Sequence, residues 1–240
     1  MLLSDLALNQ TAKFDDICRQ FQALFPAPDL VAASQDYRWP ESATSEQTLR
    51  KRTETAANFA SWSDQGLSPT EAIEHLRAVH KWGFGGQDLN RRQRYIYEEP
   101  YIDDILTMLA TWRDRKDRNE MRSTLAHVLT FPYIGIARVS KWICFLDQQS
   151  YAIYDSRVSL ALRKIEIEGR RIFPTLGAKS AGRPYQDYIG ASPDMRARKI
   201  TDVYCLFCDV LWVANQSYKF EEVADIEKAL FMLGVKKQYW

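Results

Sequence analysis

Two ionisable side chains of opposite charge flank a short apolar segment in the second half of the chain. Asp155 directly follows the apolar stretch Tyr151–Tyr154, and Lys141 stands in a segment whose spacing predicts a helix over 137–146. A fixed carboxylate can stabilise developing positive charge or orient a water molecule, and a neutral lysine amine can act as a nucleophile. Taken alone, Asp155 is also typical of a helix N-cap, because Ser156 and Arg157 open the next predicted helix.

The residues before this pair predict a tight turn between two helices. Pro132 cannot extend the helix expected over 118–130, and Gly135 supplies either a positive φ or space for a close backbone approach. Free N–H groups at the start of the following helix form a phosphate-binding site that the helix dipole strengthens. Arg138 lies in the first turn, so Gly135 and Arg138 are candidate phosphate contacts.

The window Phe131–Ile165 resembles the helix-hairpin-helix DNA glycosylase superfamily, which includes the 8-oxoguanine DNA glycosylases. The family pattern is a Leu-Pro-Gly-hydrophobic-Gly hairpin, a helix, and an extended apolar segment that ends in a catalytic aspartate. Here Phe131–Gly135 occupies the hairpin and Ile153–Asp155 the end of the extended segment, while Ala224–Phe231 resembles the closing helix. The resemblance implies an all-α fold of two closely packed helical subdomains with the site between them.

The resemblance also implies roles for the two ionisable residues. Asp155 would be the catalytic carboxylate, and Lys141 a candidate nucleophile that forms a Schiff base, for which its amine must be neutral; Arg138 is a nearby cation that favours the neutral form. The chain departs from the family at two positions: Tyr133 replaces the first hairpin glycine, and Ala137 stands where bifunctional members carry their lysine. Lys141, one turn further on, reaches over the same helix face, and its alternative role is a phosphate-contacting or surface lysine.

Further contacts follow from the same resemblance. A flipped base is bound between aromatic side chains and read along its edge by a polar one. Candidate base-pocket residues are Trp82, Phe84, Gln87, Trp142 and Phe231, each with a place in the core as its alternative. Candidate DNA-binding residues are Tyr133, Gly135, Arg138, Ser156 and Arg157.

Composition and charge are compatible with this interpretation. The 240 residues are 46% hydrophobic and 26% charged, which is typical of a soluble globular protein. Residues 122–199 hold 13 basic against 6 acidic side chains, a balance of +7 that suits a nucleic-acid backbone or forms a solvated basic face. Cys205 and Cys208 are expected in the core rather than at a metal, and no metal or organic cofactor is implied.

The chain is expected to form a single domain over 1–240, with a more variable helical part at 1–120 and the hairpin, the aspartate and the closing helices at 121–240. Helices are predicted over 11–25, 47–64, 69–82, 100–113, 118–130, 137–146, 156–167, 195–215 and 220–233, with loops at 28–47 and 169–194. The start of the chain has no basic, apolar leader, and no apolar run is long enough to span a membrane. We therefore expect a cytoplasmic protein, and the resemblance to the glycosylases implies a monomer.

Three functions compete at this stage. The first is a DNA N-glycosylase that acts on double-stranded DNA and leaves an abasic site, with AP-lyase activity if Lys141 attacks the sugar. Its substrate stays open between an oxidised purine in repair and a hypermodified phage base in antiviral defence. The second is a catalytically silent helix-hairpin-helix DNA-binding module, and the third a helical interaction or regulatory protein.

Overall fold

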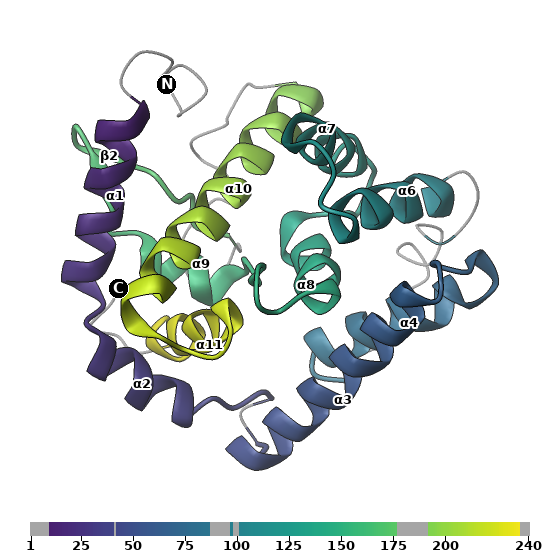
Figure 1. Cartoon of the computed structure of the whole chain (residues 1–240), viewed down its shortest axis with the longest axis horizontal. Helices are drawn as coiled ribbons and strands as arrows, with labels where there is room; N and C mark the ends of the chain where they lie inside the picture. Colours follow the sequence, from purple (N-terminus) through teal and green to yellow (C-terminus); the bar gives the residue numbers. More distant parts are fainter. Residues whose placement is uncertain (1–9, 41, 87–96, 98–100, 177–191, 236–240) are drawn as a thin grey trace.

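The described part of the chain is predominantly helical, as predicted. The computed structural model describes residues 10–40, 42–86, 97, 101–176 and 192–235. Within them lie ten helices and one two-stranded antiparallel sheet (Figure 1). The helices are α1 (Gln10–Leu24), α2 (Ala27–Gln35), α3 (Ser45–Asp64), α4 (Pro69–Gly83), α6 (Tyr101–Arg113), α7 (Arg118–Val128), α8 (Ile136–Leu146), α9 (Ser156–Leu162), α10 (Pro193–Tyr218) and α11 (Val223–Leu233); the strands are β1 (Glu166–Ile167) and β2 (Arg170–Arg171).

Two predicted elements were wrong. The loop expected over 28–47 begins with α2, because proline fits the first turn of a helix and Leu30 and Ala33 are buried. The helix expected over 156–167 ends at Leu162, and β1 and β2 follow. Glu168 and Gly169 both take a positive φ, of 53° and 72°, which is the backbone of a tight hairpin turn.

The helices form two groups that share one continuous core. α2 and α9 pack against α11 and α1 packs on α10, whereas α3, α4, α6 and α7 pack against one another and around α8. α10 joins the groups, since it contacts α1 and α11 as well as α7 and α8 (Figure 1). α1 and α2, from the first part of the chain, pack with the C-terminal helices.

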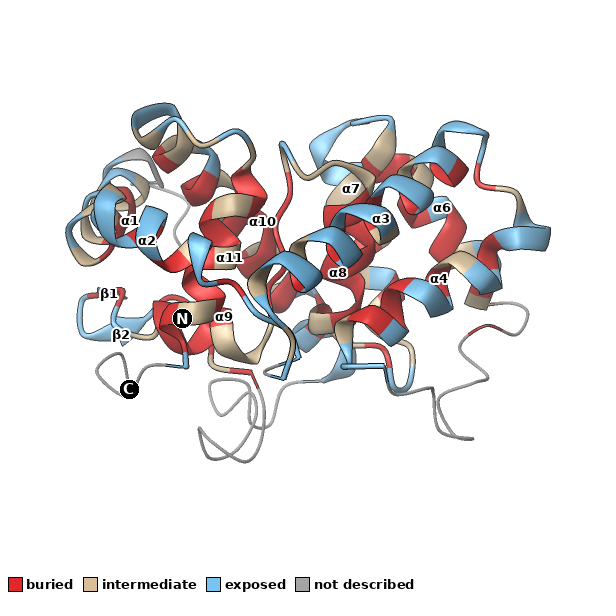
Figure 2. Cartoon of the chain, turned by 90° about the horizontal axis from the view of Figure 1, so that it is seen from below, coloured by how far each residue is buried: buried red, intermediate tan, exposed pale blue. Residues whose placement is uncertain are grey.

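Helix α8 lies beside the boundary between the two groups and is largely buried. Nine of its eleven residues are buried, including Arg138, Ser140 and Lys141. Figure 2 shows buried residues on the sides where helices face each other and exposed residues on the outer sides. Because water does not reach these polar groups, protein atoms have to satisfy them. None of the described helices is long and apolar enough to cross a lipid bilayer.

Candidate functional site

Of the two geometries expected at Gly135, the structure shows the open backbone and not the positive φ. Tyr133 has φ 62°, so this exposed tyrosine, and not Gly135, takes the left-handed conformation that favours glycine. Gly135 is the N-cap of α8 at φ −135°, without a side-chain cap. A Cβ built on Gly135 meets no atom within 4 Å, so the backbone here is open to an approaching group.

Arg138 holds this turn from the inside. Its side chain is buried, its Nη1 donates to the Tyr133 carbonyl over 2.7 Å, and burial lowers the pKa of its guanidinium. The guanidinium also lies 5.8 Å from the Phe84 ring centroid. Arg138 is therefore placed to stabilise the left-handed Tyr133 and not to present its charge on the surface as a phosphate contact.

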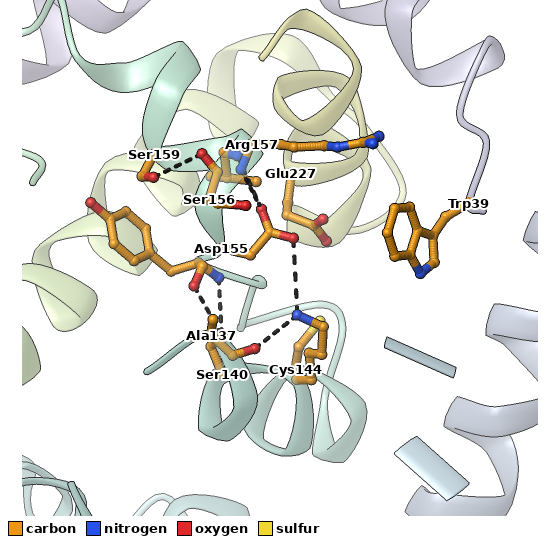
Figure 3. A network of polar contacts seen from close by, with 12 residues as sticks. Trp39, Ala137, Ser140, Cys144, Asp155, Ser156, Arg157, Ser159 and Glu227 are labelled. Carbon is orange, nitrogen blue, oxygen red and sulfur yellow. Dashed lines mark hydrogen bonds and ion pairs between the residues drawn. The ribbon is translucent and has the colours of Figure 1, made fainter. Parts of the chain in front are cut away.

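The segment Tyr151–Tyr154, which leads to Asp155, is buried and held by side-chain hydrogen bonds. The Tyr154 amide donates to Ser140 Oγ of α8 over 3.1 Å, and the Tyr154 hydroxyl donates to the Pro174 carbonyl over 2.8 Å. Tyr204 of α10 donates to the Ala152 carbonyl over 3.0 Å. Asp155 is thus delivered by a chain segment fixed on several sides (Figure 3).

Asp155 uses its two carboxylate oxygens differently. Oδ1 accepts hydrogen bonds from the backbone amides of Arg157 at 3.0 Å and Val158 at 3.1 Å, so the residue is the N-cap of α9. Oδ2 faces the Lys141 Nζ at 3.9 Å (Figure 3). The N-cap interpretation is confirmed, and the same cap fixes a carboxylate oxygen beside the lysine.

Lys141 is enclosed by protein. Its side chain is 6% exposed, and Nζ donates to the Ala137 carbonyl over 2.8 Å. Burial lowers the pKa of Lys141, while Asp155 acts in the opposite direction. Room for the side chain is made by Gly83: a Cβ there would collide with Lys141 Cδ and come within 2.5 Å of its Cε.

A buried ion pair that sequence reasoning missed lies next to these residues. Arg52 Nη2 of α3 donates to Glu227 Oε2 of α11 over 2.6 Å, and the two side chains are 2% and 1% exposed. Arg52, rather than the expected Arg138, is the cation that lowers the pKa of Lys141. The sequence contains a sign of this buried pair, because Arg52 and Glu227 each lie on the buried face of a helix. Arg52 lies one turn from both Thr48 and Ala56, which are buried.

These side chains surround a small cavity between the two helix groups. Its volume is about 10 Å³. Its walls are Tyr37, Trp39, Trp82, Gly83, Lys141, Ile153, Asp155, Glu227 and Phe231. Lys141, Trp82 and Gly83 come from the group around α8, whereas Asp155, Glu227 and Phe231 come from the group around α11. The candidate site therefore lies between two packed helical units.

Only some of the candidate base-pocket residues lie at the cavity. Trp82 and Phe231 line the cavity, and the Lys141 Nζ lies 5.5 Å from the centroid of the Phe84 ring. Trp142 is fully buried in the core, with its Nε1 donating to the Leu76 carbonyl, so its assignment to the pocket was wrong. Gln87 lies outside the described residues.

Arg157 and Ser156 lie at the site and not at the hairpin. The Arg157 guanidinium lies 4.6 Å from the Phe231 ring centroid and 5.0 Å from that of Trp39, an aromatic residue that sequence reasoning missed. Ser156 is half-buried, and its carbonyl accepts from Ser159 Oγ. Gly234, at the end of α11, approaches so closely that a Cβ there would collide with the Arg157 carbonyl.

Other features of the described residues stand apart from this chemistry. A cavity of about 460 Å³ lies between α7 and α10, and another of about 240 Å³ adjoins Gly135 and Arg196. Cys205 and Cys208 are buried free thiols, and burial raises the pKa of Cys205 to about 12. The described residues hold no group of three or more His, Cys, Asp or Glu placed to bind a metal ion.

Comparisons of the chain with protein-family models, with curated proteins and with solved structures find no match. A function for this chain therefore has to be inferred from its own side chains.

Proposed function

We propose that this chain is a DNA N-glycosylase that extrudes a damaged or modified base from double-stranded DNA and releases it. The observation that carries the proposal is the buried Lys141 amine, 3.9 Å from a carboxylate oxygen of Asp155. A buried lysine whose pKa is lowered and which faces a carboxylate at a cavity is typical of a reaction centre. A chemical role is favoured here because Asp155 caps α9 with Oδ1, which leaves Oδ2 to face Lys141.

Both side chains have a role in breaking an N-glycosidic bond. Positive charge develops on the deoxyribose as the base departs, and the fixed Asp155 carboxylate stabilises that charge without having to reorganise. Neutral Lys141 attacks C1′ with its nitrogen lone pair while the bond from C1′ to the base breaks, and the electron pair leaves with the base. Loss of a proton from the resulting amine and opening of the sugar give a Schiff base, from which the DNA strand can be cleaved.

The turn before α8 provides a surface for DNA. The uncapped backbone at Gly135, with open space beyond it, suits a phosphate group at a helix N-terminus. Tyr133 is 51% exposed beside it and can contact the same strand. The basic balance of residues 122–199 agrees with such a partner. We propose that the protein acts there as a monomer in the cytoplasm, without a metal or an organic cofactor.

Entry of a base requires side chains to move. A cavity of about 10 Å³ has room for about one water molecule and not for a nucleobase. Trp39, Phe231 and Arg157 contact one another at its edge and are the side chains whose displacement would admit a base. An oxidised purine and a hypermodified phage cytosine remain the two substrate classes proposed.

The small cavity also favours the second candidate, a DNA-binding module without catalysis. A site that never opens would leave Lys141 and Asp155 as a structural pair. This candidate predicts salt-sensitive DNA binding with no base released from any substrate.

The deciding experiment measures base release from duplexes that carry 8-oxoguanine, uracil, alkylated purines or glucosylated hydroxymethylcytosine, with abasic sites scored by alkaline cleavage. We expect release from one class, and at least a 100-fold loss in Asp155→Asn with DNA binding kept. Asp117→Asn is the matched control, because Asp117 caps α7 through the same two kinds of backbone hydrogen bond, remote from the site. Equal release by Asp155→Asn and wild type would refute the mechanism.

A second assay tests the nucleophile. Borohydride reduction should link the wild-type protein covalently to its substrate DNA, and Lys141→Met should remove the adduct. Base release without a trapped adduct in the wild type would mean that water, held by Asp155, is the nucleophile.

A further inference from the structure

We propose that Glu227 is the proton acceptor for Lys141 and that Arg52 is the positioning residue that holds Glu227 in place. The inference rests on the proposed glycosylase function and adds a third ionisable side chain to the Lys141–Asp155 pair. No element of the sequence resemblance assigns a role to either residue.

Glu227 has one carboxylate oxygen left for this role. Oε2 is the oxygen that Arg52 binds at 2.6 Å, so Oε1 is the oxygen that this ion pair leaves for the transfer. Glu227 lines the same cavity as Lys141 and Asp155, and Figure 3 shows its carboxylate beside that of Asp155. A space of about 10 Å³ between three ionisable groups can hold one water molecule, which can pass a proton from the amine to Oε1.

Arg52 is itself held on several sides, so it can fix Glu227. Its Nε donates to Gln148 Oε1 over 3.1 Å and its Nη1 to the Tyr37 hydroxyl over 3.2 Å. The guanidinium also lies over the Trp82 ring, 5.6 Å from its centroid. A buried guanidinium with these contacts stays charged and keeps the carboxylate in one orientation.

Among the described residues, the ionisable groups around the Lys141–Glu227 pair come from five places in the fold. They are Tyr37 just after α2, Arg52 of α3, Cys144 of α8, Asp155 at the start of α9, and Lys228 of α11 with Glu222 at its N-cap. Asp155 and Arg52 act on both members of the pair. Burial raises the pKa of Glu227 despite the opposing effect of Arg52, and burial lowers the pKa of Lys141. The two pKa values move toward each other, so transfer of a proton between the groups becomes easier.

The transfer completes the proposed reaction. A proton leaves Lys141 Nζ and forms an O–H bond on Glu227, which frees the lone pair that attacks C1′. As the bond from C1′ to the base breaks, the base takes the electron pair and then the proton from Glu227. The carboxylate returns to its starting state, and no external acid or base is consumed.

Glu227→Gln separates this role from an electrostatic one, because the two predict opposite results. Loss of the negative charge lowers the pKa of Lys141 and so increases its neutral fraction at neutral pH. A purely electrostatic Glu227 therefore predicts equal or faster trapping at pH 7. A proton acceptor predicts at least a 10-fold lower rate at pH values where Lys141 is still charged, and a loss that shrinks toward the plateau where the lysine is already neutral. Glu221→Gln, an exposed carboxylate just before α11, is the matched control and should trap at the wild-type rate.

A second variant covers the case in which Glu227→Gln does not fold. Glu227→Ala leaves a cavity beside the Arg52 guanidinium, into which formate fits. Added formate should increase the trapping rate of Glu227→Ala at least 10-fold. Chloride at the same ionic strength should not increase it. No rescue by formate in a folded Glu227→Ala protein would overturn the proposal.

A titration without DNA distinguishes failure of this inference from failure of the glycosylase function. The pKa of Lys141 is measured by NMR on protein with labelled lysine side chains, its signal identified by its loss in Lys141→Met. It should fall in Glu227→Gln, because the carboxylate that raises it is removed, and stay unchanged in Glu221→Gln. An unchanged Lys141 pKa in Glu227→Gln means that the two groups are not coupled, whether or not any base is released.

Discussion

Asp155 shows how one side chain can have a structural and a chemical role together. Oδ1 caps α9, an interaction that typically stabilises a helix by about 1 kcal/mol. The same hydrogen bonds prevent the carboxylate from rotating, so Oδ2 stays directed at Lys141. A capping interaction that sequence reasoning treated as the alternative to catalysis is therefore what orients the oxygen to which we assign the catalytic role.

The pH dependence of trapping reports the state of Lys141. The attacking form is the neutral amine, which forms as the pH rises through the Lys141 pKa. Because burial lowers this pKa from the ordinary value of 10.5, the rise in trapping rate should occur at lower pH than for an exposed lysine. A single-turnover trapping series across pH measures it. A half-maximal rate at or above 10.5 would contradict a buried, neutral nucleophile.

Gly83 is expected to be necessary for the position of Lys141. A methyl group at Gly83 would collide with the middle of the lysine side chain, so Gly83→Ala should displace the amine and reduce trapping at least 10-fold. The free energy of unfolding should change by less than about 1 kcal/mol, since alanine also favours the helical end of α4. In a Lys141→Ala background the collision is absent, and Gly83→Ala should then be neutral or stabilising in urea unfolding.

At the scale of elements, the site depends on how α8 and α9 begin. The turn before α8 leaves its N-terminal amides uncapped, whereas α9 begins with a side-chain cap. Between the two helices, Ser140 of α8 accepts a hydrogen bond from the Tyr154 amide and so ties the extended segment to the helix that carries Lys141. One helix start is therefore available to a ligand, and the other is used to hold a carboxylate.

Gly135→Ala tests whether the open start of α8 contacts DNA. A φ of −135° is accessible to alanine, and the added methyl meets no protein atom, so the fold should be unaffected. A phosphate group that approaches the backbone would meet this methyl. We expect a 5-fold or greater loss of duplex affinity by fluorescence anisotropy at fixed salt, with an unchanged unfolding midpoint. Wild-type affinity would place the DNA surface elsewhere.

At the scale of the whole molecule, the Arg52–Glu227 pair connects the two helix groups through the core. Arg52→Met leaves a buried carboxylate without its partner, which typically costs about 3–5 kcal/mol. Replacing both charges, in Arg52→Met with Glu227→Leu, removes the unpaired group and should recover most of that loss. Urea unfolding of the wild type, both single variants and the double variant measures the coupling. Additive effects would show that the pair is not energetically linked.

The local sequence pattern was enough to predict most of the helices and the segment that leads to Asp155. Helical spacing of apolar residues identified most helices, and the apolar segment before Asp155 was placed correctly outside them. The lysine that faces Asp155 was also identified from its distance along the helix after the hairpin. These features depend on neighbours along the chain, whose backbone geometry the residue types largely specify.

Only the tertiary structure decided what surrounds that pair. Arg52 and Glu227 lie far apart in the chain and become partners because folding brings these side chains of α3 and α11 within hydrogen-bond distance. Trp39 and Arg157 are brought to Phe231 in the same way, while Trp142, in the same helix as Lys141, turns into the core. The apolar stripe of a helix shows which face is buried but not which helix covers it, so the identity of the partners is determined only when the helices pack.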